Sequence, residues 1–369
     1  MGGMMRLFLC KAAVLPRCQI DNPPGSKDNG RFDKHHGPHS IILKEFPVTA
    51  PWITYRPELK VLDCTIRDGG LVNDHQFSDE FVRAVYQANV EAGIDFMEIG
   101  YKNSKELFPR DKFGPWKHCD EEDIRRIVGD NDTSLKLSVM ADAEKSNWKT
   151  EILPSEDSVL DAIRVAFYAH QLSEAVDMIH DAAEKGYEVS ANLMAISITT
   201  EKEIDQVWEV IAETPAEVLV VVDSFGSLYS EQVASLIKMY LGYGKPTGKE
   251  AGIHAHNNQQ LAFANTIESI VQGANRVDAS IGGIGRGAGN CPMELLIGFL
   301  RNPKFKLRPI YKTLQETFEP LKRDIEWGPY PQFQMTGQNN QHPRAAIEAR
   351  SGAKREDYVG FYDELVSDY

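Results

Sequence analysis

The sequence has few cysteines and lacks an excess of positive charge. The five cysteines are odd in number and include no Cys-x-x-Cys pair, which argues against a disulfide framework or a zinc knuckle. We therefore expect a reducing, cytoplasmic location. Lys and Arg number 40 against 54 Asp and Glu, a net charge of −14, so a nucleic-acid partner bound through its phosphates is not expected. No uncharged apolar run approaches the roughly 18 residues of a membrane span, so no membrane partner is expected.

Apolar runs alternate with amphipathic ones from Val61 onwards. With 42% hydrophobic and 25% charged residues, the composition is that of a globular protein with a sizeable core. The predicted strands are 61–66, 95–100, 135–140, 161–167, 188–196, 217–222, 251–256 and 275–281. The predicted helices between them include 78–92, 120–128, 171–185, 201–213, 229–241 and 259–272.

This alternation predicts an α/β fold, and its length favours a (β/α)8 TIM barrel. A doubly wound open sheet is the alternative, but no Gly-x-Gly-x-x-Gly run follows the first predicted strand. We expect an N-terminal arm over 1–60, irregular in the Pro-, Gly- and His-rich stretch 17–40. The barrel then covers 61–300, and a mostly helical C-terminal extension covers 301–369.

Polar residues occur near the ends of nearly all the predicted strands. In a TIM barrel these C-terminal strand ends build the active site. The polar residues are Arg67, Asp68, Glu98, Tyr101, Arg164, Asn192, Asp223, Ser224, His254, His256 and Asp278. We therefore predict a functional site at this rim, with Arg164 and Asn192 among its substrate-binding residues.

His254 and His256 form the most specific motif. Residues i and i+2 of a strand point to the same side, so both imidazoles can reach one ion. Two His and one carboxylate make a facial triad suited to a divalent transition metal. Asp68, at the end of the first predicted strand, supplies that carboxylate across the closed barrel. A pair of hydrogen-bonded histidines on a half-buried strand is the alternative, which the presence of Asp68 disfavours.

Two further features surround this predicted site. Arg67 is a candidate to bind a carboxylate and stabilise an enolate oxygen, although a salt bridge closing the barrel end is the alternative. The glycine-rich run 282–290 could hold an anion on its amides, or carry Asn290 towards the metal. It lacks the Lys-Ser/Thr of a P-loop, so nucleotide binding is not favoured. No Lys follows the sixth predicted strand, which favours metal over Schiff-base chemistry.

These motifs resemble those of the metal-dependent pyruvate aldolases, specifically 4-hydroxy-2-oxovalerate aldolase-like members of the DRE-TIM metallolyase superfamily with its HMGL-like catalytic domain. The resemblance covers about 61–300. It is carried by ordered segments at 62–69 (LDCTIRDG), 75–77, 163–166, 221–224, 252–256, 264–267, 276–280 and 287–290.

The resemblance implies a carbon–carbon lyase. The implied metal ligands are Asp68, His254 and His256, with Asn290 as a fourth candidate, and the implied ion is manganese, or else magnesium or cobalt. The implied reaction cleaves a 4-hydroxy-2-oxo acid to pyruvate and an aldehyde, or condenses them, through a metal-bound enolate. An oligomer of identical chains is implied as well.

The resemblance also assigns roles around the substrate, and one position departs from it. Arg67 is implied to steady the pyruvate enolate, and Ser224 to contact the pyruvate carboxylate. Where the aldolases carry a histidine base, this chain has Leu71, which cannot take a proton. Candidate replacements are Asn73, Asp74, His75 and Tyr330, of which we take His75 and Tyr330 as catalytic candidates. The C-terminal part differs from aldolases that pass their aldehyde to a partner dehydrogenase, so no such partner is expected.

Two alternative functions stay open on the sequence. One is a Claisen-type synthase that joins an acyl-CoA to a 2-oxo acid, like isopropylmalate or homocitrate synthase, because it uses the same metal ligands. The run 286–290 resembles theirs, but the chain after 301 looks too short for their regulatory domain. The other is a catalytically impaired barrel that acts as a binding protein, which Leu71 suggests and the retained metal ligands disfavour.

Overall fold

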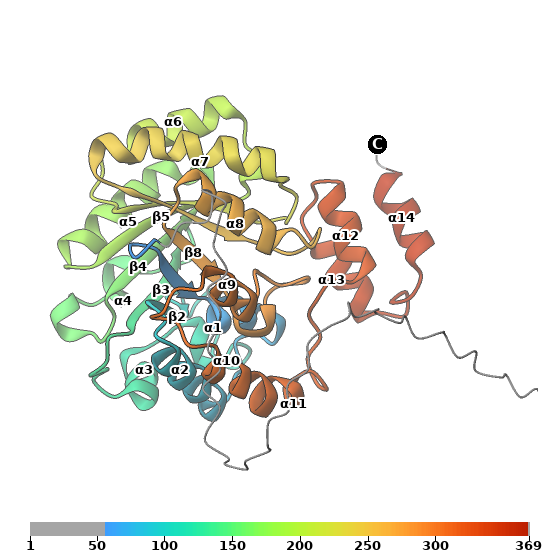
Figure 1. Ribbon diagram of the computed structural model, residues 1–369, viewed down its shortest axis with the longest axis horizontal. Coiled ribbons are helices and arrows are strands. Elements are labelled where there is room, and N and C mark those ends of the chain that lie inside the picture. The colour runs from blue at the N-terminus through green and yellow to red at the C-terminus, as the bar shows by residue number, and fades with distance from the viewer. Residues whose placement is uncertain (1–55, 368–369) are drawn as a thin grey trace, which may run out of the picture. The chain divides into compact units, whose positions relative to one another are not determined.

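The computed structural model describes residues 56–367, in which eight parallel strands close into a barrel in strict chain order (Figure 1). Of the predicted arm over 1–60, residues 1–55 lie outside the described residues. The strands are β1 Lys60–Asp63, β2 Phe96–Tyr101, β3 Lys136–Asp142, β4 Ala162–Phe167, β5 Glu188–Leu193, β6 Val218–Asp223, β7 Glu250–Ala255 and β8 Arg276–Ala279. The predicted TIM-barrel fold is confirmed.

Helices surround these strands and follow the predicted alternation. They are α1 Thr65–Gly69, α2 Asp79–Ala92, α3 Glu121–Val128, α4 Trp148–Glu151, α5 Leu172–Glu184, α6 Glu201–Ile211, α7 Ser230–Gly244, α8 Ala262–Gln272 and α9 Met293–Leu300. Their apolar faces pack on the outer, branched side chains of the strands, such as Ile163, Val189 and Ile253, which are fully buried.

The first strand is shorter than predicted. The sequence pattern extends it to residue 66, whereas β1 ends at Asp63 and the chain turns directly into the single helical turn α1. Asp63 accepts hydrogen bonds from the backbone N–H and the hydroxyl of Thr65, which stabilise this turn. Arg67 and Asp68 therefore lie on a helical turn above the strand end and not on the strand itself.

Helix α2 begins and ends where the sequence indicates. The Ser78 hydroxyl accepts a hydrogen bond from the Phe81 N–H at 3.3 Å, and Gly93 closes the helix with a φ of 74°. We expect Ser78→Ala to lower the free energy of unfolding by about 1 kcal/mol, because one N-terminal N–H loses its partner. The shift in the urea midpoint measures this. The control is Ser235→Ala, at an exposed position of α7, and an equal shift in both variants would contradict the capping role.

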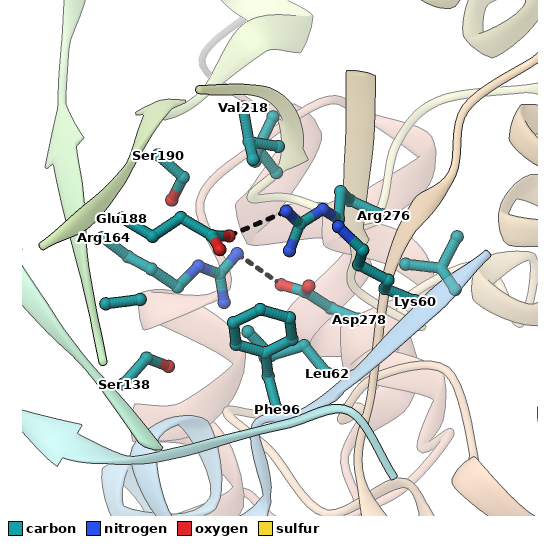
Figure 2. Close-up of a pocket in the computed structure, with 13 residues that line it drawn as sticks. Lys60, Leu62, Phe96, Ser138, Arg164, Glu188, Ser190, Val218, Arg276 and Asp278 are labelled. Atoms are coloured by element: carbon teal, nitrogen blue, oxygen red, sulfur yellow. Dashed lines mark hydrogen bonds and ion pairs between the residues drawn. The ribbon is translucent and has the colours of Figure 1, made fainter. Parts of the chain in front are cut away.

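Charged side chains close the N-terminal end of the barrel. Arg276 contacts Glu188 at 2.7 Å (Figure 2). Arg276 also contacts Glu250, which in turn accepts from Lys60 at 3.4 Å. Ion pairs at this face contribute to stability and not to chemistry, since TIM-barrel active sites lie at the opposite end. The functional site is therefore sought at the C-terminal strand ends.

The part of the chain after 301 is mostly helical, as predicted. Its helices are α10 Leu307–Thr313, α11 Glu319–Leu321, α12 Pro331–Gln338, α13 Arg344–Ser351 and α14 Tyr358–Val366. Helix α12 packs against the barrel mouth, where a Cβ on Gly337 would lie 3.0 Å from Asn258, and Asn340 donates to the Ser197 carbonyl at 2.9 Å. Within residues 56–367, no helix is long and apolar enough to cross a membrane.

Candidate functional site

The three predicted metal ligands come together at the barrel mouth. One potential ligand atom from each of Asp68, His254 and His256 lies within 4.8 Å of the others, and all three residues are buried. His254 belongs to β7 and His256 follows it, while Asp68 reaches them from α1. Closure of the barrel therefore brings together residues almost two hundred positions apart in the sequence.

The unsatisfied polar atoms of this cluster fit a divalent cation. Among the described residues, His254 Nε2, His256 Nδ1 and Asn290 Oδ1 are buried and have no hydrogen-bond partner. Buried polar atoms without partners are uncommon, and these three are all atoms that can donate a lone pair to a metal. Together with the Asp68 carboxylate they form a mixed nitrogen and oxygen ligand set.

The charges of the cluster suit metal binding as well. Burial by itself would raise the pKa of Asp68, but His256, Arg67 and His254 lower it far below its usual range, so the carboxyl is ionised. Burial also holds the pKa of His256 well below its usual range, despite the opposing effect of Asp68. A neutral imidazole beside a carboxylate is the protonation state that a metal requires.

The glycine-rich run lets Asn290 approach Asp68. Asn290 Nδ2 donates to the Asp68 carboxylate at 2.7 Å and to the Ile284 carbonyl at 3.1 Å. A Cβ on Gly285 would lie 2.3 Å from Asn290 and 2.5 Å from Asp68, so a larger residue does not fit there. The run therefore carries Asn290 to the Asp68 carboxylate, beside the two histidines of the cluster.

A chain of buried ion pairs beneath the cluster orients His254. Asp278 accepts from His254 Nδ1 at 3.0 Å, so Nε2 is the nitrogen without a partner among the described residues. Arg164 crosses the barrel interior to contact the same Asp278 oxygen at 2.6 Å (Figure 2). Its other terminal nitrogen donates to Glu98 at 3.1 Å. Arg164, Glu98 and Asp278 thus form a layer inside the barrel, and the structure does not bring Arg164 to the rim where substrate binding was predicted.

Arg67 connects this layer to the metal ligands. Its Nε donates to Glu98 at 2.6 Å and its Nη1 donates to Asp68 at 2.7 Å. Among residues 56–367, its Nη2 has no partner, although the residue is only 3% exposed. Arg67 therefore forms the salt bridges expected of an arginine that closes the barrel end. It also keeps one N–H group without a partner.

A cavity of about 190 Å³ opens above these residues. Arg67, Asp68, His254 and His256 form one part of its wall, and Ser224, Asn192, Tyr168, Arg286 and His342 contribute further polar groups. An apolar wall consists of Leu71, Tyr101, Met140, Ala166 and Met194. Lys117, Asp142 and Lys145 lie on the side that follows β2 and β3. A concave site in which polar groups converge opposite an apolar wall is typical of a small-molecule site.

Two of the predicted substrate-binding residues line this cavity. The Ser224 hydroxyl oxygen accepts from the Ala195 N–H at 2.8 Å, so the hydroxyl proton stays available to a ligand. Asn192 is fully buried and accepts from Ser190 at 2.7 Å, while its Nδ2 has no partner among the described residues. Arg286 Nη2 donates to the Ser224 carbonyl at 2.7 Å, which adds a cation beside that position.

The two candidate bases are placed away from the cavity. His75 is buried against Tyr101 with 5.3 Å between ring centroids and is not among the cavity-lining residues. Burial, reinforced by Lys117 and Arg67, keeps the pKa of His75 well below its usual range. Tyr330 begins α12 and stacks under Arg350, 3.5 Å from its ring centroid, also outside the cavity. The position of the missing histidine, Leu71, does line the cavity.

Several lining residues could not be identified from sequence reasoning. Lys117 lies in the short turn Pro115–Lys117 (η2), Asp142 ends β3 and Lys145 follows it, while His342 belongs to the C-terminal extension. None belongs to a motif with a fixed spacing. Only Asp142, the last residue of a strand, carries a positional signal that could have indicated it.

Comparisons with known proteins place the chain in a family. The family model described as HMGL-like matches residues 58–317. An oxaloacetate decarboxylase of Mycobacterium tuberculosis is 30% identical over 243 residues, which cover 65% of this chain and 69% of that protein. A 4-hydroxy-2-oxovalerate aldolase of Thermus thermophilus is 27% identical over 280 residues, covering 73% and 77% of the two chains.

A solved structure agrees in fold. The N-terminal domain of a Bacteroides vulgatus protein titled "putative aldolase" superposes with a TM-score of 0.69 at 26% identity, over 82% of this chain and all of that domain. The family match extends over more than two thirds of the sequence and includes every residue of the metal cluster. The chain therefore belongs to the HMGL-like family and is an enzyme of the lyase and aldolase type.

Proposed function

We propose that this protein is a divalent-metal-dependent carbon–carbon lyase that cleaves a 4-hydroxy-2-oxo acid to pyruvate and an aldehyde, or joins the two. The observation that carries this proposal is the buried Asp68, His254 and His256 cluster at the barrel mouth, with the free Nη2 of Arg67 beside it. The aldolase relatives support the same class of reaction.

The proposed metal ligands are Asp68, His254 and His256, with Asn290 as a fourth. The bound ion would supply Lewis-acid chemistry to the keto group of the substrate. We propose manganese, with magnesium or cobalt as alternatives, because mixed imidazole and carboxylate ligands suit divalent transition metals. A cytoplasmic location and self-association remain part of this proposal.

The surrounding side chains bind and orient the substrate. The Ser224 hydroxyl and the Asn192 amide donate to the carboxylate of the 2-oxo acid. Arg67 donates through Nη2 to the oxygen that becomes negative as the C3–C4 bond breaks. The net cleavage moves one proton from the 4-hydroxyl oxygen to C3: the O–H electrons form the aldehyde carbonyl, the C3–C4 electrons form the pyruvate enolate, and C3 is protonated.

A second candidate is decarboxylation of oxaloacetate, and Leu71 favours it. Loss of CO2 from oxaloacetate leaves the same enolate of pyruvate, which takes one proton, but there is no 4-hydroxyl to deprotonate. A leucine at the position of the family's base is therefore compatible with this reaction. The Mycobacterium tuberculosis relative carries the name of this activity.

Pyruvate release, coupled to lactate dehydrogenase, tests the proposal. We expect manganese-dependent release of pyruvate from at least one member of a panel of 4-hydroxy-2-oxo acids, and loss of that release on chelation. Release from oxaloacetate alone would select the decarboxylase. No release from any compound by the metal-loaded protein would contradict both, and thiol release from an acyl-CoA with a 2-oxo acid would then identify a Claisen-type synthase.

A further inference from the structure

Lys117 presents an unpaired ammonium group to the cavity. The residue is 5% exposed, and its Nζ lies 4.2 Å from the ring centroid of Tyr101 and 4.4 Å from that of Phe108. In the part of the chain from 56 to 367, no carboxylate oxygen lies within 4.0 Å of this nitrogen. The aromatic rings give the cation partial compensation but no opposite charge.

The charged groups near Lys117 leave a positive excess on this side of the cavity. The Asp142 carboxylate is already 3.8 Å from Lys145 and accepts from Asn103 at 3.4 Å. Asp74 acts on Lys117 more weakly than Asp142 does. Arg67 adds no net excess because Asp68 and Glu98 neutralise it. The Asp142 carboxylate is therefore the main negative charge near both Lys117 and Lys145.

An uncompensated charge is unfavourable in so buried a position. Burial lowers the pKa of Lys117 to about 8, with Lys145 and Arg67 adding to the effect against the opposing Asp142. Buried charges in proteins are normally paired. Because Lys117 lines a cavity, an anion that enters with a ligand can supply the missing partner.

The shape of the cavity places this cation away from the metal ligands. The ligands lie above β1 and β7, whereas Lys117 and Lys145 follow β2 and β3. The apolar side chains of Tyr101 and Met140 line the wall on that side. A 2-oxo acid whose keto and carboxylate groups face the metal ligands would extend its carbon chain along this wall.

We propose that the part of the substrate remote from the 2-oxo acid carries an anionic group, a carboxylate or a phosphate, which Lys117 binds with Lys145 as a second cation. This inference rests on the proposed function for the orientation of the substrate. Lys117 is a specificity-determining residue in this arrangement.

Binding of two acids of equal length tests the proposal without catalysis. We expect the manganese-loaded wild type to bind 2-oxopentanedioate about tenfold more tightly than 2-oxopentanoate in calorimetric titrations, because the two differ only in the terminal carboxylate. We expect Lys117→Met to remove this preference and Lys117→Arg to retain most of it. The control Lys238→Met, at an exposed position of α7, leaves it unchanged. The preference weakens above about pH 8 as Lys117 loses its charge.

The contrary results are equally defined. Equal affinities of the wild type for both acids, and for 2-oxopentanoate bearing a 5-phosphate, would overturn the proposal. Tighter binding of the phosphorylated acid alone would identify phosphate as the anionic group. If the preference for the diacid survives Lys117→Met and kcat falls for neutral and anionic substrates alike, the anion-site proposal is overturned. That result would identify Lys117 as a proton-transfer group.

Folding of the variants is a separate check. Lys117→Met replaces an unpaired buried charge by an apolar chain, so we expect its melting temperature to equal or exceed that of the wild type. If that variant unfolds, Lys117→Gln and Lys145→Met carry the binding test. If no 4-hydroxy-2-oxo acid is cleaved but the preference for the diacid depends on Lys117, the lyase proposal fails and the anion site stands.

Discussion

His254→Ala is expected to abolish manganese binding and to reduce pyruvate release by at least about a thousandfold. The variant removes Nε2, one of the two proposed imidazole ligands, and leaves Asp68, His256 and Asn290, which cannot hold the ion in the same geometry. Lewis-acid stabilisation contributes several kcal/mol to such a reaction, and each 1.36 kcal/mol corresponds to about a tenfold change in rate. Metal content of the purified protein and the coupled pyruvate assay measure the two effects.

A thermal readout separates metal loss from unfolding. A ligand at 100 times its Kd stabilises a folded protein by about 2.7 kcal/mol, so manganese raises the melting temperature of the wild type. We expect no such rise for His254→Ala. The control His180→Ala, at an exposed position of α5, is expected to behave as the wild type. A metal-dependent rise of equal size in His254→Ala would show that the ion binds elsewhere.

Arg67→Lys is expected to lower kcat by about a hundredfold with a smaller change in KM. The guanidinium donates to Glu98 through Nε and to Asp68 through Nη1, while Nη2 has no partner among residues 56–367. A lysine keeps the charge but cannot occupy all three directions, so it loses the donor that acts on the developing enolate. Steady-state kinetics of pyruvate release measure the effect.

The control for this variant is Arg323→Lys, which changes an exposed arginine in the same way. Manganese binding by Arg67→Lys should persist, because the three metal ligands are retained. An unchanged kcat in Arg67→Lys would show that Arg67 serves only the ion pairs with Asp68 and Glu98. If Arg67→Lys lost both manganese and activity, the role of Arg67 would be to position Asp68.

The barrel and the clustering of Asp68, His254 and His256 could both be predicted from the sequence because each depends on short-range regularities. Eight apolar runs separated by amphipathic ones indicate parallel strands and crossover helices. His254 and His256 share a face by the two-residue period of a strand, and closure of the barrel brings Asp68 to them. The sequence could not show that Glu98, Arg164 and Asp278 lie inside the barrel and not at its rim. Along one strand, the residues that point inwards and those near the strand end follow the same alternating pattern.

The sequence by itself determined the fold, the family and the three residues that gather at the barrel mouth, since strand periodicity and motif order suffice for these. Only the tertiary structure decided which polar residues face the cavity. It buries His75 against Tyr101, turns Arg164 downwards to Asp278, and brings Lys117 and His342 to the cavity wall. These placements depend on loop geometry and on pairing between charges far apart in the chain, neither of which leaves a local pattern in the sequence.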